Sequence, residues 1–353
     1  MNKVGLAFIC GNETKQIEEM LDSVECVKFD SISATITRNS PETEKILKKR
    51  KVKISKVPVW KEDYSNWDFA KARQLSYDNC EADWIIYLDT DDVLQGAEKL
   101  RELVEKCKDY DAIMLPYDYE PNNIYSKERI IKKGKYYWRG LVHECQVPKS
   151  ETKWITSNEV IVKHNIISND RFERNLRIIE REYSSAKTPR TVFYCAKDSM
   201  FLGRNEKAIC YTKEFLEMDD CREQKHNACM MVVRMMIDRA DYDGALEWCG
   251  KAITFAPEYC EPYYKAALAK LKKGLSVDCL MLLAEGNKKR QEPPFGTPYN
   301  KMEFTMLPKE IYLQALTMAT PIELKSVAYD LINSIEFSRI RLQEINNEIA
   351  RRS

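Results

Sequence analysis

The chain of 353 residues carries 56 lysines and arginines against 55 acidic residues, so its formal net charge is only +1. This balance excludes a uniformly basic, nucleic-acid-binding surface, although a local basic groove stays open. The 12 cysteines show no C-x-x-C spacing, and the 3 histidines exclude a His-rich metal site. No apolar run has membrane-spanning length and no signal peptide opens the chain, so we expect a cytoplasmic protein with reduced thiols and two or three domains. Composition does not indicate the oligomeric state.

Strand-like and helix-like patterns alternate along the first 116 residues. Short apolar or β-branched runs predict strands at 4–9, 31–37, 52–59, 84–88 and 112–116. Apolar residues recur at helical spacing after Glu13, and Ser40-Pro41 is typical of a helix start. Further helices are predicted at 68–78 and 95–107. This alternation indicates a doubly wound α/β domain with a parallel sheet.

The pattern changes after Tyr119 to short runs rich in Tyr, Trp, Val and Ile. These runs predict strands at 126–131, 136–138, 145–147 and 160–164. Hairpin-like turns at Lys133-Gly134 and Arg139-Gly140 separate some of them. We expect an antiparallel annex that completes the sheet and makes it mixed.

From Asn169 onward the sequence is helical and repetitive. Gly203, Ala240 and Gly274 occupy turn positions 37 and then 34 residues apart, and a small residue follows each by five positions, at Ala208, Ala245 and Cys279. A period near 34 with small residues at the helix crossings is typical of tetratricopeptide-like hairpins. Prolines and a glycine interrupt the helical pattern at 291–298, and helix returns at 307–352. The predicted domains are therefore 1–168, 169–292 and 293–353.

The stretch A-D-W-I-I-Y-L-D-T-D-D-V-L, residues 82–94, places three carboxylates directly after a buried strand. Ligand sites of open α/β sheets lie at the carboxyl ends of their strands. Three crowded carboxylates raise one another's pKa unless a cation neutralises them. Asp89 and Asp91 suit a hard divalent ion that keeps positions for phosphate oxygens, with Asp92 as adjacent support. A solvated acidic turn is the simpler alternative.

Two other stretches carry polar residues that can join this cluster. Arg73 lies one helical turn after Phe69 on the inward face, where it needs an anionic partner, and a diphosphate beside Asp89 is one candidate. Asp68 can serve as the cap of the same helix. His143 and Glu144 are adjacent, so in extended chain only one of them faces the site.

Four motifs in order resemble the family 2 glycosyltransferases with a GT-A fold. They are W-D-F-A-K-A-R-Q-L at 67–75, W-I-I-Y-L-D-T-D-D at 84–92, W-R-G-L-V-H-E at 138–144 and K-H-N-I at 163–166. The resemblance spans about residues 1–290 and is greatest to the bacterial-type subgroup with C-terminal tetratricopeptide-like repeats. It implies a Rossmann-like mixed-sheet catalytic domain followed by an all-α repeat domain.

The resemblance also implies roles for single residues. A divalent metal, Mn²⁺ or Mg²⁺, would be held by Asp89, Asp91 and His164. Catalysis would fall to Glu144 as general base, together with Asp91. The nucleotide-sugar donor would contact the residues Asn12, Glu13, Arg73, Asp89 and Thr90. The implied reaction is an inverting transfer of a sugar from a nucleotide diphosphate sugar, with a UDP-sugar as the first choice.

One segment departs from the family pattern. Family members carry an acidic D-x-G-S-x-D segment after the second strand, whereas this chain has T-I-T-R-N-S-P-E-T at 35–43, where Arg38 is new. An inactive, glycosyltransferase-like protein that binds partners through its repeats is therefore the rival interpretation. For an active enzyme, a protein or peptide acceptor is favoured by analogy with repeat surfaces. Saccharide, lipid-linked and modified nucleic-acid acceptors stay open, the last because of basic clusters at 48–53 and 132–135.

Overall fold

The computed structural model describes residues 2–120, 123–165, 171–218, 221–290, 301–320 and 322–324. The chain forms two compact units, Met1–Lys187 and Thr188–Ser353, so the helix at 171–185 belongs to the first unit. The domain boundaries at 168 and 292 stay predictions. The predicted break at 291–298, and the predicted helix beyond residue 324, lie outside the described residues. Within these residues, no helix is both long and apolar enough to cross a bilayer.

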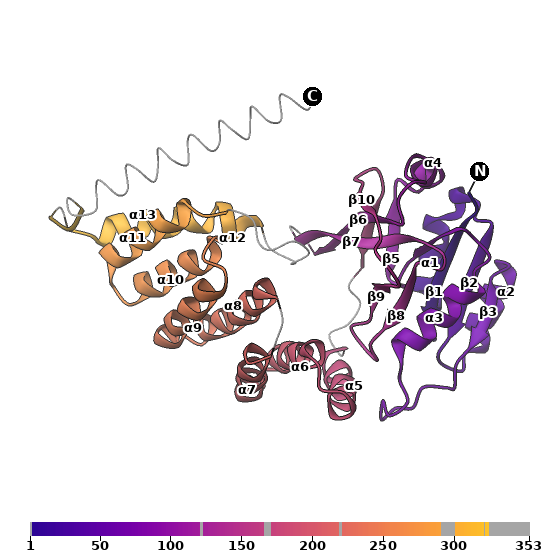
Figure 1. The fold of residues 1–353 in the computed structure, drawn as a ribbon, viewed down its shortest axis with the longest axis horizontal. Coiled ribbons are helices and arrows are strands. Elements are labelled where there is room, and N and C mark those ends of the chain that lie inside the picture. Colours follow the sequence, from indigo (N-terminus) through magenta and orange to yellow (C-terminus); the bar gives the residue numbers. More distant parts are fainter. Residues whose placement is uncertain are drawn as a thin grey trace. The chain divides into compact units, whose positions relative to one another are not determined.

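A mixed nine-stranded sheet forms the centre of the first unit (Figure 1). Its strands run in the order β3-β2-β1-β4-β7-β6-β11-β5, with β10 paired to β6. The strands are β1 (Val4–Cys10), β2 (Ser31–Ile36), β3 (Lys53–Lys56), β4 (Trp84–Tyr87), β5 (Asp92–Gln95), β6 (Ala112–Glu120), β7 (Asn123–Lys132), β10 (Trp154–Thr156) and β11 (Ile161–His164). The first four pair in parallel, whereas β7 runs antiparallel between β4 and β6.

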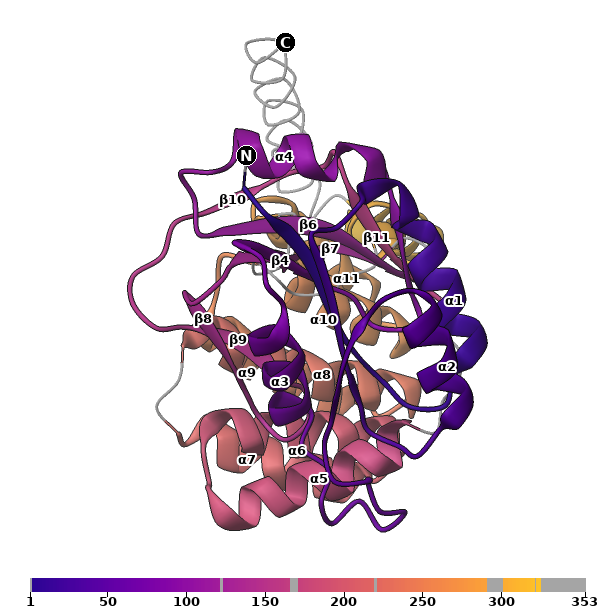
Figure 2. The same cartoon turned by 90° about the vertical axis from the view of Figure 1, so that its right-hand side faces the viewer.

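Helices cover both faces of this sheet. They are α1 (Thr14–Ser23), α2 (Pro41–Lys49), α3 (Phe69–Asn79) and α4 (Leu100–Lys106). A further helix of this unit, α5 (Arg171–Ser185), contacts the loop before α3, where Arg181 donates to the carbonyl oxygens of Tyr64 and Trp67. Alternate residues of β1 face opposite ways: Leu6 and Phe8 pack in the cluster that holds α1 and α4, while Ala7 packs in the cluster on the α3 side. Figure 2 shows α1 and α3 on opposite sides of the indigo strand that follows the N-terminus. The predicted α/β domain with a mixed sheet is thus confirmed.

Local sequence explains where the helices begin. The Ser40 side chain accepts from Thr43 N with Pro41 at the first helical position of α2, and Asp68 accepts from Lys71 N to cap α3. The predicted helix at 95–107 is wrong in its first part. There, β5 reaches Gln95, and Gly96, at a φ of 75°, turns the chain toward α4. Antiparallel pairing of β5 with β11 decides this outcome, and it is a contact that local periodicity cannot reveal.

The annex strands do not all join the main sheet. β8 (Tyr136–Arg139) and β9 (Cys145–Pro148) form a separate antiparallel ribbon. Strand β10 was not predicted, and the predicted strand at 52–59 is shorter, as β3. β7 and β11 do complete the sheet.

The second unit consists of helical hairpins. These are α6 (Pro189–Phe201) with α7 (Asn205–Leu216), α8 (Arg222–Asp238) with α9 (Tyr242–Phe255), and α10 (Glu261–Lys272) with α11 (Ser276–Asn287), before α12 (Lys301–Thr305) and α13 (Leu307–Met318). Gly203, Ala240 and Gly274 lie at the hairpin turns with φ of 69°, 57° and 75°. Ala208, Ala245 and Cys279 are fully buried, so the predicted repeat register is confirmed.

Replacing Ala240 by glycine should stabilise the second unit. An L-residue at a φ of 57° is strained by its Cβ, and the two equivalent turns use glycine. We expect Ala240→Gly to raise the free energy of unfolding by about 0.5–1 kcal/mol in chemical denaturation. Ala208→Gly, inside a helix, should lower it by about 1 kcal/mol. Equal losses in both variants would contradict the turn assignment.

Candidate active site

The end of β4 brings three aspartates into one tight turn. Its strand residues and Leu88 are buried, and the chain leaves the sheet at Asp89 and starts β5 at Asp92. Asp89 N donates to Asp92 Oδ2 at 3.0 Å, and Asp92 N donates to Asp89 O at 3.0 Å. These reciprocal bonds fix Asp91 at the apex between them.

Arg73 on α3 links this turn to the predicted general base. Its Nε donates to Glu144 Oε1 at 2.5 Å, and its Nη2 donates to Asp89 Oδ1. The side chain of Arg73 is only 9% exposed. Burial disfavours the charged guanidinium, but Asp89 and Glu144 outweigh that effect and raise the pKa of Arg73. Arg73, Asp89 and Glu144 therefore meet, and the partners of Arg73 are these two carboxylates, whereas the sequence analysis named a diphosphate beside Asp89 as one candidate.

His143 is turned away from regular strand geometry. Its φ of 51° is left-handed, in the loop between β8 and β9. The extended conformation considered for His143 and Glu144 therefore does not occur at His143. Glu144 is the residue of this pair that contacts Arg73. Only 11% of the Glu144 side chain is exposed.

Arg129 on β7 is a second buried cation that the sequence analysis missed. Its Nη1 lies 3.1 Å from Asp92 Oδ2 and 3.8 Å from Asp89 Oδ2, and both the Arg129 and Asp92 side chains are fully buried. The Arg129 guanidinium carbon lies 4.7 Å from the Tyr87 ring centre and 4.3 Å from that of Tyr117. The available signal was the spacing of Lys127 and Arg129, which puts two cations on one face of a predicted strand.

Asp91, Asp92 and His164 form a group able to hold a metal ion. One ligand atom from each lies within 4.8 Å of the others. His164 Nδ1 is 3.1 Å from Asp92 Oδ1 and 3.6 Å from Asp91 Oδ1, while the buried His164 Nε2 has no hydrogen-bond partner within the described ranges. Carboxylate and imidazole donors, with one imidazole nitrogen still unpaired, fit a divalent ion.

Charge crowding acts differently on Asp91 and Asp89. The pKa of Asp91 is raised to about 6 by burial and by the charge of Asp89, against the opposing effect of His164. Burial alone would raise the pKa of Asp89 too, but Arg73 and Arg129 outweigh it and hold that pKa below its ordinary value. Asp89 is thus paired with arginines, and Asp92, not Asp89, is the carboxylate that lies beside Asp91 and His164. Metal ligation by Asp89 stays a prediction.

The predicted donor residues lie at the start of α1 and beside Asp91. Thr90 Oγ1 donates to Glu13 Oε1 at 3.1 Å, and Gly11 N donates to the same oxygen at 2.9 Å. Asn12 is exposed. A hollow of about 200 Å³ adjoins this region, lined by Lys15, Gln16, Glu19, Thr90, Asp91, Val93 and Asn165.

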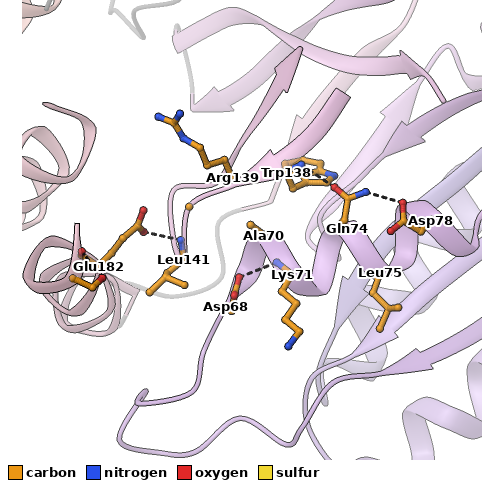
Figure 3. A pocket seen from close by; sticks show the side chains of 12 residues that line it. Asp68, Ala70, Lys71, Gln74, Leu75, Asp78, Trp138, Arg139, Leu141 and Glu182 are labelled. Carbon is orange, nitrogen blue, oxygen red and sulfur yellow. Dashed lines mark hydrogen bonds between the residues drawn. The ribbon is translucent and has the colours of Figure 1, made fainter. Parts of the chain in front are cut away.

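A larger hollow of about 680 Å³ lies along α3 (Figure 3). Gln74 Oε1 accepts from Trp138 N at 2.9 Å on one side of it, and Glu182 accepts from Leu141 N at 2.7 Å on the other. None of the site carboxylates lines this hollow. Only Trp138 is shared, because its ring lies 5.1 Å from the Arg73 guanidinium carbon. The larger hollow is therefore separate from the turn of Asp89, Asp91 and Asp92, which we call the aspartate turn.

Comparison with known proteins agrees with these motifs. Two curated relatives, the SPbeta prophage-derived glycosyltransferase SunS of Bacillus subtilis (strain 168) and glycosyltransferase SunS of Bacillus phage SPbeta, are each 23% identical over 255 residues. The chain is distantly similar to glycosyltransferases. The matches cover 67% of this chain and 59% of the length of these relatives. No family model matches.

Solved structures give a weaker likeness. S. aureus TarS is 13% identical, with 90% of this chain and 93% of that chain covered at a TM-score of 0.33. Glucosyl-3-phosphoglycerate synthase from Mycobacterium tuberculosis, in complex with Mn²⁺, UDP and phosphoglyceric acid, is 13% identical, with 51% and 78% covered at a TM-score of 0.34. These scores are too low to support a function. The resemblance expected from the motifs is confirmed as a distant similarity.

Removing Arg129 should destabilise the first unit strongly. Arg129→Met leaves the fully buried Asp92 without its main counter-charge, so we expect a loss of about 3 kcal/mol in the free energy of unfolding. Arg50→Met removes only partly exposed ion pairs to Asp22 and Glu25 and should cost below about 1 kcal/mol. Adding Asp92→Asn to Arg129→Met should recover part of the loss. Chemical denaturation measures all three, and equal losses for Arg129 and Arg50 would contradict a buried, charge-balancing role.

Proposed function

We propose that this protein is an inverting, metal-dependent glycosyltransferase that uses a nucleotide diphosphate sugar, with a UDP-sugar as first choice. The observation that carries the proposal is the Arg73 bridge between Asp89 and Glu144, next to the group of Asp91, Asp92 and His164. Glu144, the candidate base, thus lies near a group of residues that could hold a divalent cation, and that cation could bind the phosphates of the donor. The distant similarity to glycosyltransferases supports this reaction class.

Asp91, Asp92 and His164 would hold the divalent ion, Mn²⁺ or Mg²⁺, in this proposal. When bound, that ion neutralises the negative charge that develops on the leaving diphosphate. Asp89 is a further carboxylate next to these residues, and its orientation is fixed by Arg73 and Arg129. Glu13 and Thr90, joined by a hydrogen bond, would orient the donor at the start of α1, with Asn12 beside them.

Glu144 is the proposed general base. Arg73 holds its Oε1, so the second carboxylate oxygen is the one that accepts a proton from the acceptor. As the acceptor oxygen or nitrogen bonds to the anomeric carbon, the bond from that carbon to the diphosphate oxygen breaks on the opposite face. The diphosphate leaves with the electron pair, and the proton ends on Glu144.

A protein or peptide is the proposed acceptor. Stacked helical hairpins, such as those from α6 to α11, present extended surfaces that suit an extended chain. A peptide acceptor also places no demand on the oligomeric state.

A panel of UDP-, GDP-, CMP- and dTDP-sugars with and without Mn²⁺ tests the donor assignment. Ligand that binds only the folded state raises the thermal midpoint. We expect one nucleotide to do so with Mn²⁺, and Asp91→Asn to abolish the rise because a ligand of the ion is lost. Without ligand, Asp91→Asn should not lower the midpoint, since it relieves repulsion from Asp89. No shift with any donor would refute the transferase proposal and favour the binding role.

Glu144→Gln separates base chemistry from donor binding. The amide oxygen can still accept from Arg73, but it cannot take up a proton, so kcat should fall about 10²–10⁴-fold while donor affinity is kept. Sugar transfer is measured at saturating donor, and Glu151→Gln, at an exposed position, serves as the control. A matched loss of donor affinity would show that Glu144 binds the donor instead.

A further inference from the structure

Two arginines lie over one group of aromatic rings, Trp60, Trp67 and Phe69, near the site. The Arg38 and Arg174 guanidinium carbons lie 5.4 Å and 5.6 Å from the centre of the Trp67 ring, and Arg174 is also 5.3 Å from that of Phe69. Trp60 stacks on Trp67 at 4.5 Å and so occupies one face of that ring. The two guanidiniums therefore share what remains of its surface.

Arg171 extends this group toward the metal ligands. Its guanidinium carbon lies 5.5 Å from the ring of Tyr119, and that ring stacks on His164 at 5.0 Å. We call Arg38, Arg171 and Arg174 the arginine cluster. It begins at Arg38, whose side chain lies close to Gly11, and it ends at Arg171, whose partner ring Tyr119 stacks on His164.

Within the described part of the chain, no carboxylate forms an ion pair with any member of the cluster. Arg174 donates only to the neutral Asn175 Oδ1, at 3.0 Å. Its pKa is lowered by burial and by the charges of Arg171 and Arg38, and the largest opposing effect comes from Glu144, which Arg73 already binds. Clustered like charges without counter-ions are unfavourable unless a ligand supplies the negative charge.

The backbone around the cluster is held in place. Arg181, further along α5, donates to the carbonyl oxygens of Tyr64 and Trp67, and Trp67 Nε1 donates to Lys61 O at 2.7 Å. Hydrogen bonds thus connect the segment that carries the Trp67 ring to α5, the helix that carries Arg171 and Arg174. These bonds pre-organise the guanidiniums before any ligand binds.

We propose that the arginine cluster binds a second anionic group, a phosphate or carboxylate, carried by the transferred sugar or by the acceptor. This inference rests on the proposed transferase function, because it names the charge of the substrate beside Glu144. In that proposed function, a divalent ion held by Asp91, Asp92 and His164 would bind the donor diphosphate, so the arginine cluster would take a different anionic group. Arg38 lies in the segment 35–43, which lacks the aspartates of the family pattern, so this segment also contributes positive charge where the pattern has negative charge.

Binding of inorganic phosphate in the presence of EDTA tests the cluster without the metal site. Calorimetry should detect phosphate binding to the full-length chain, weakened about tenfold or more in Arg174→Gln and in Arg171→Gln, since each loses charge-assisted hydrogen bonds. Arg177→Gln is the matched control, because Arg177 lies on the same helix but is exposed and paired with Glu173 at 3.0 Å. Absence of phosphate binding, or equal weakening in Arg177→Gln, overturns the proposal.

Competition against phosphate identifies the source of the anion. Stronger displacement by UDP-glucuronate than by UDP-glucose, lost in Arg174→Gln, assigns the group to the transferred sugar. Stronger displacement by a phosphoserine peptide than by its serine counterpart, lost in the same variant, assigns it to the acceptor. Equal displacement by UDP-glucose and UDP-glucuronate, without any peptide effect, reduces the cluster to a diphosphate contact and overturns the proposal. Donor binding with Mn²⁺ is scored separately, so failure of the transferase assignment is distinguishable.

Discussion

Repulsion among carboxylates at the end of β4 is the constraint on which the first unit depends. Asp89, Asp91 and Asp92 lie within one turn, and buried arginines form ion pairs with two of them, Asp89 and Asp92. Arg73 comes from α3 and Arg129 from β7, the antiparallel neighbour of β4. A helix and a strand therefore both contribute positive charge to this turn. No arginine of the described residues forms an ion pair with Asp91, and burial together with the charge of Asp89 raises its pKa.

The same constraint separates two kinds of carboxylate in the site. Asp89 and Glu144 are fixed by Arg73, which favours a defined orientation over free coordination. Asp91 and His164 keep the atoms that a cation can take, and the unpaired Nε2 of His164 is the clearest mark of this. Buried ion pairs of this kind contribute orientation more than stability. The arrangement therefore favours positioning for chemistry over strength of folding.

Much of the fold could be predicted because its signals are local. The strands of β1, β2 and β4, the caps at Ser40 and Asp68, and the turns at Gly203 and Gly274 all follow from neighbouring residues. The strand β5 could not be predicted, since only its pairing with β11 makes residues 92–95 extended. Likewise, helical spacing placed Arg73 on the inward face of its helix. The position of Arg129 could not be predicted, because it depends on the insertion of β7 between β4 and β6. The part that sequence missed is the part that long-range pairing creates.

The antiparallel pairing of β5 with β11 has a consequence for how the molecule folds. Asp92 and His164 are 72 positions apart in the sequence, and Arg73 and Glu144 are 71 positions apart. Contacts so distant along the chain form slowly, because loop closure must precede them. Until α3, β7 and β11 are all in place, the aspartate turn lacks its partners Arg73, Arg129 and His164, so the long-range steps of folding are also those in which its charges become balanced. The rate of those steps should therefore depend on ionic strength, whereas formation of the helical hairpins, built from local contacts, should be far less sensitive to salt.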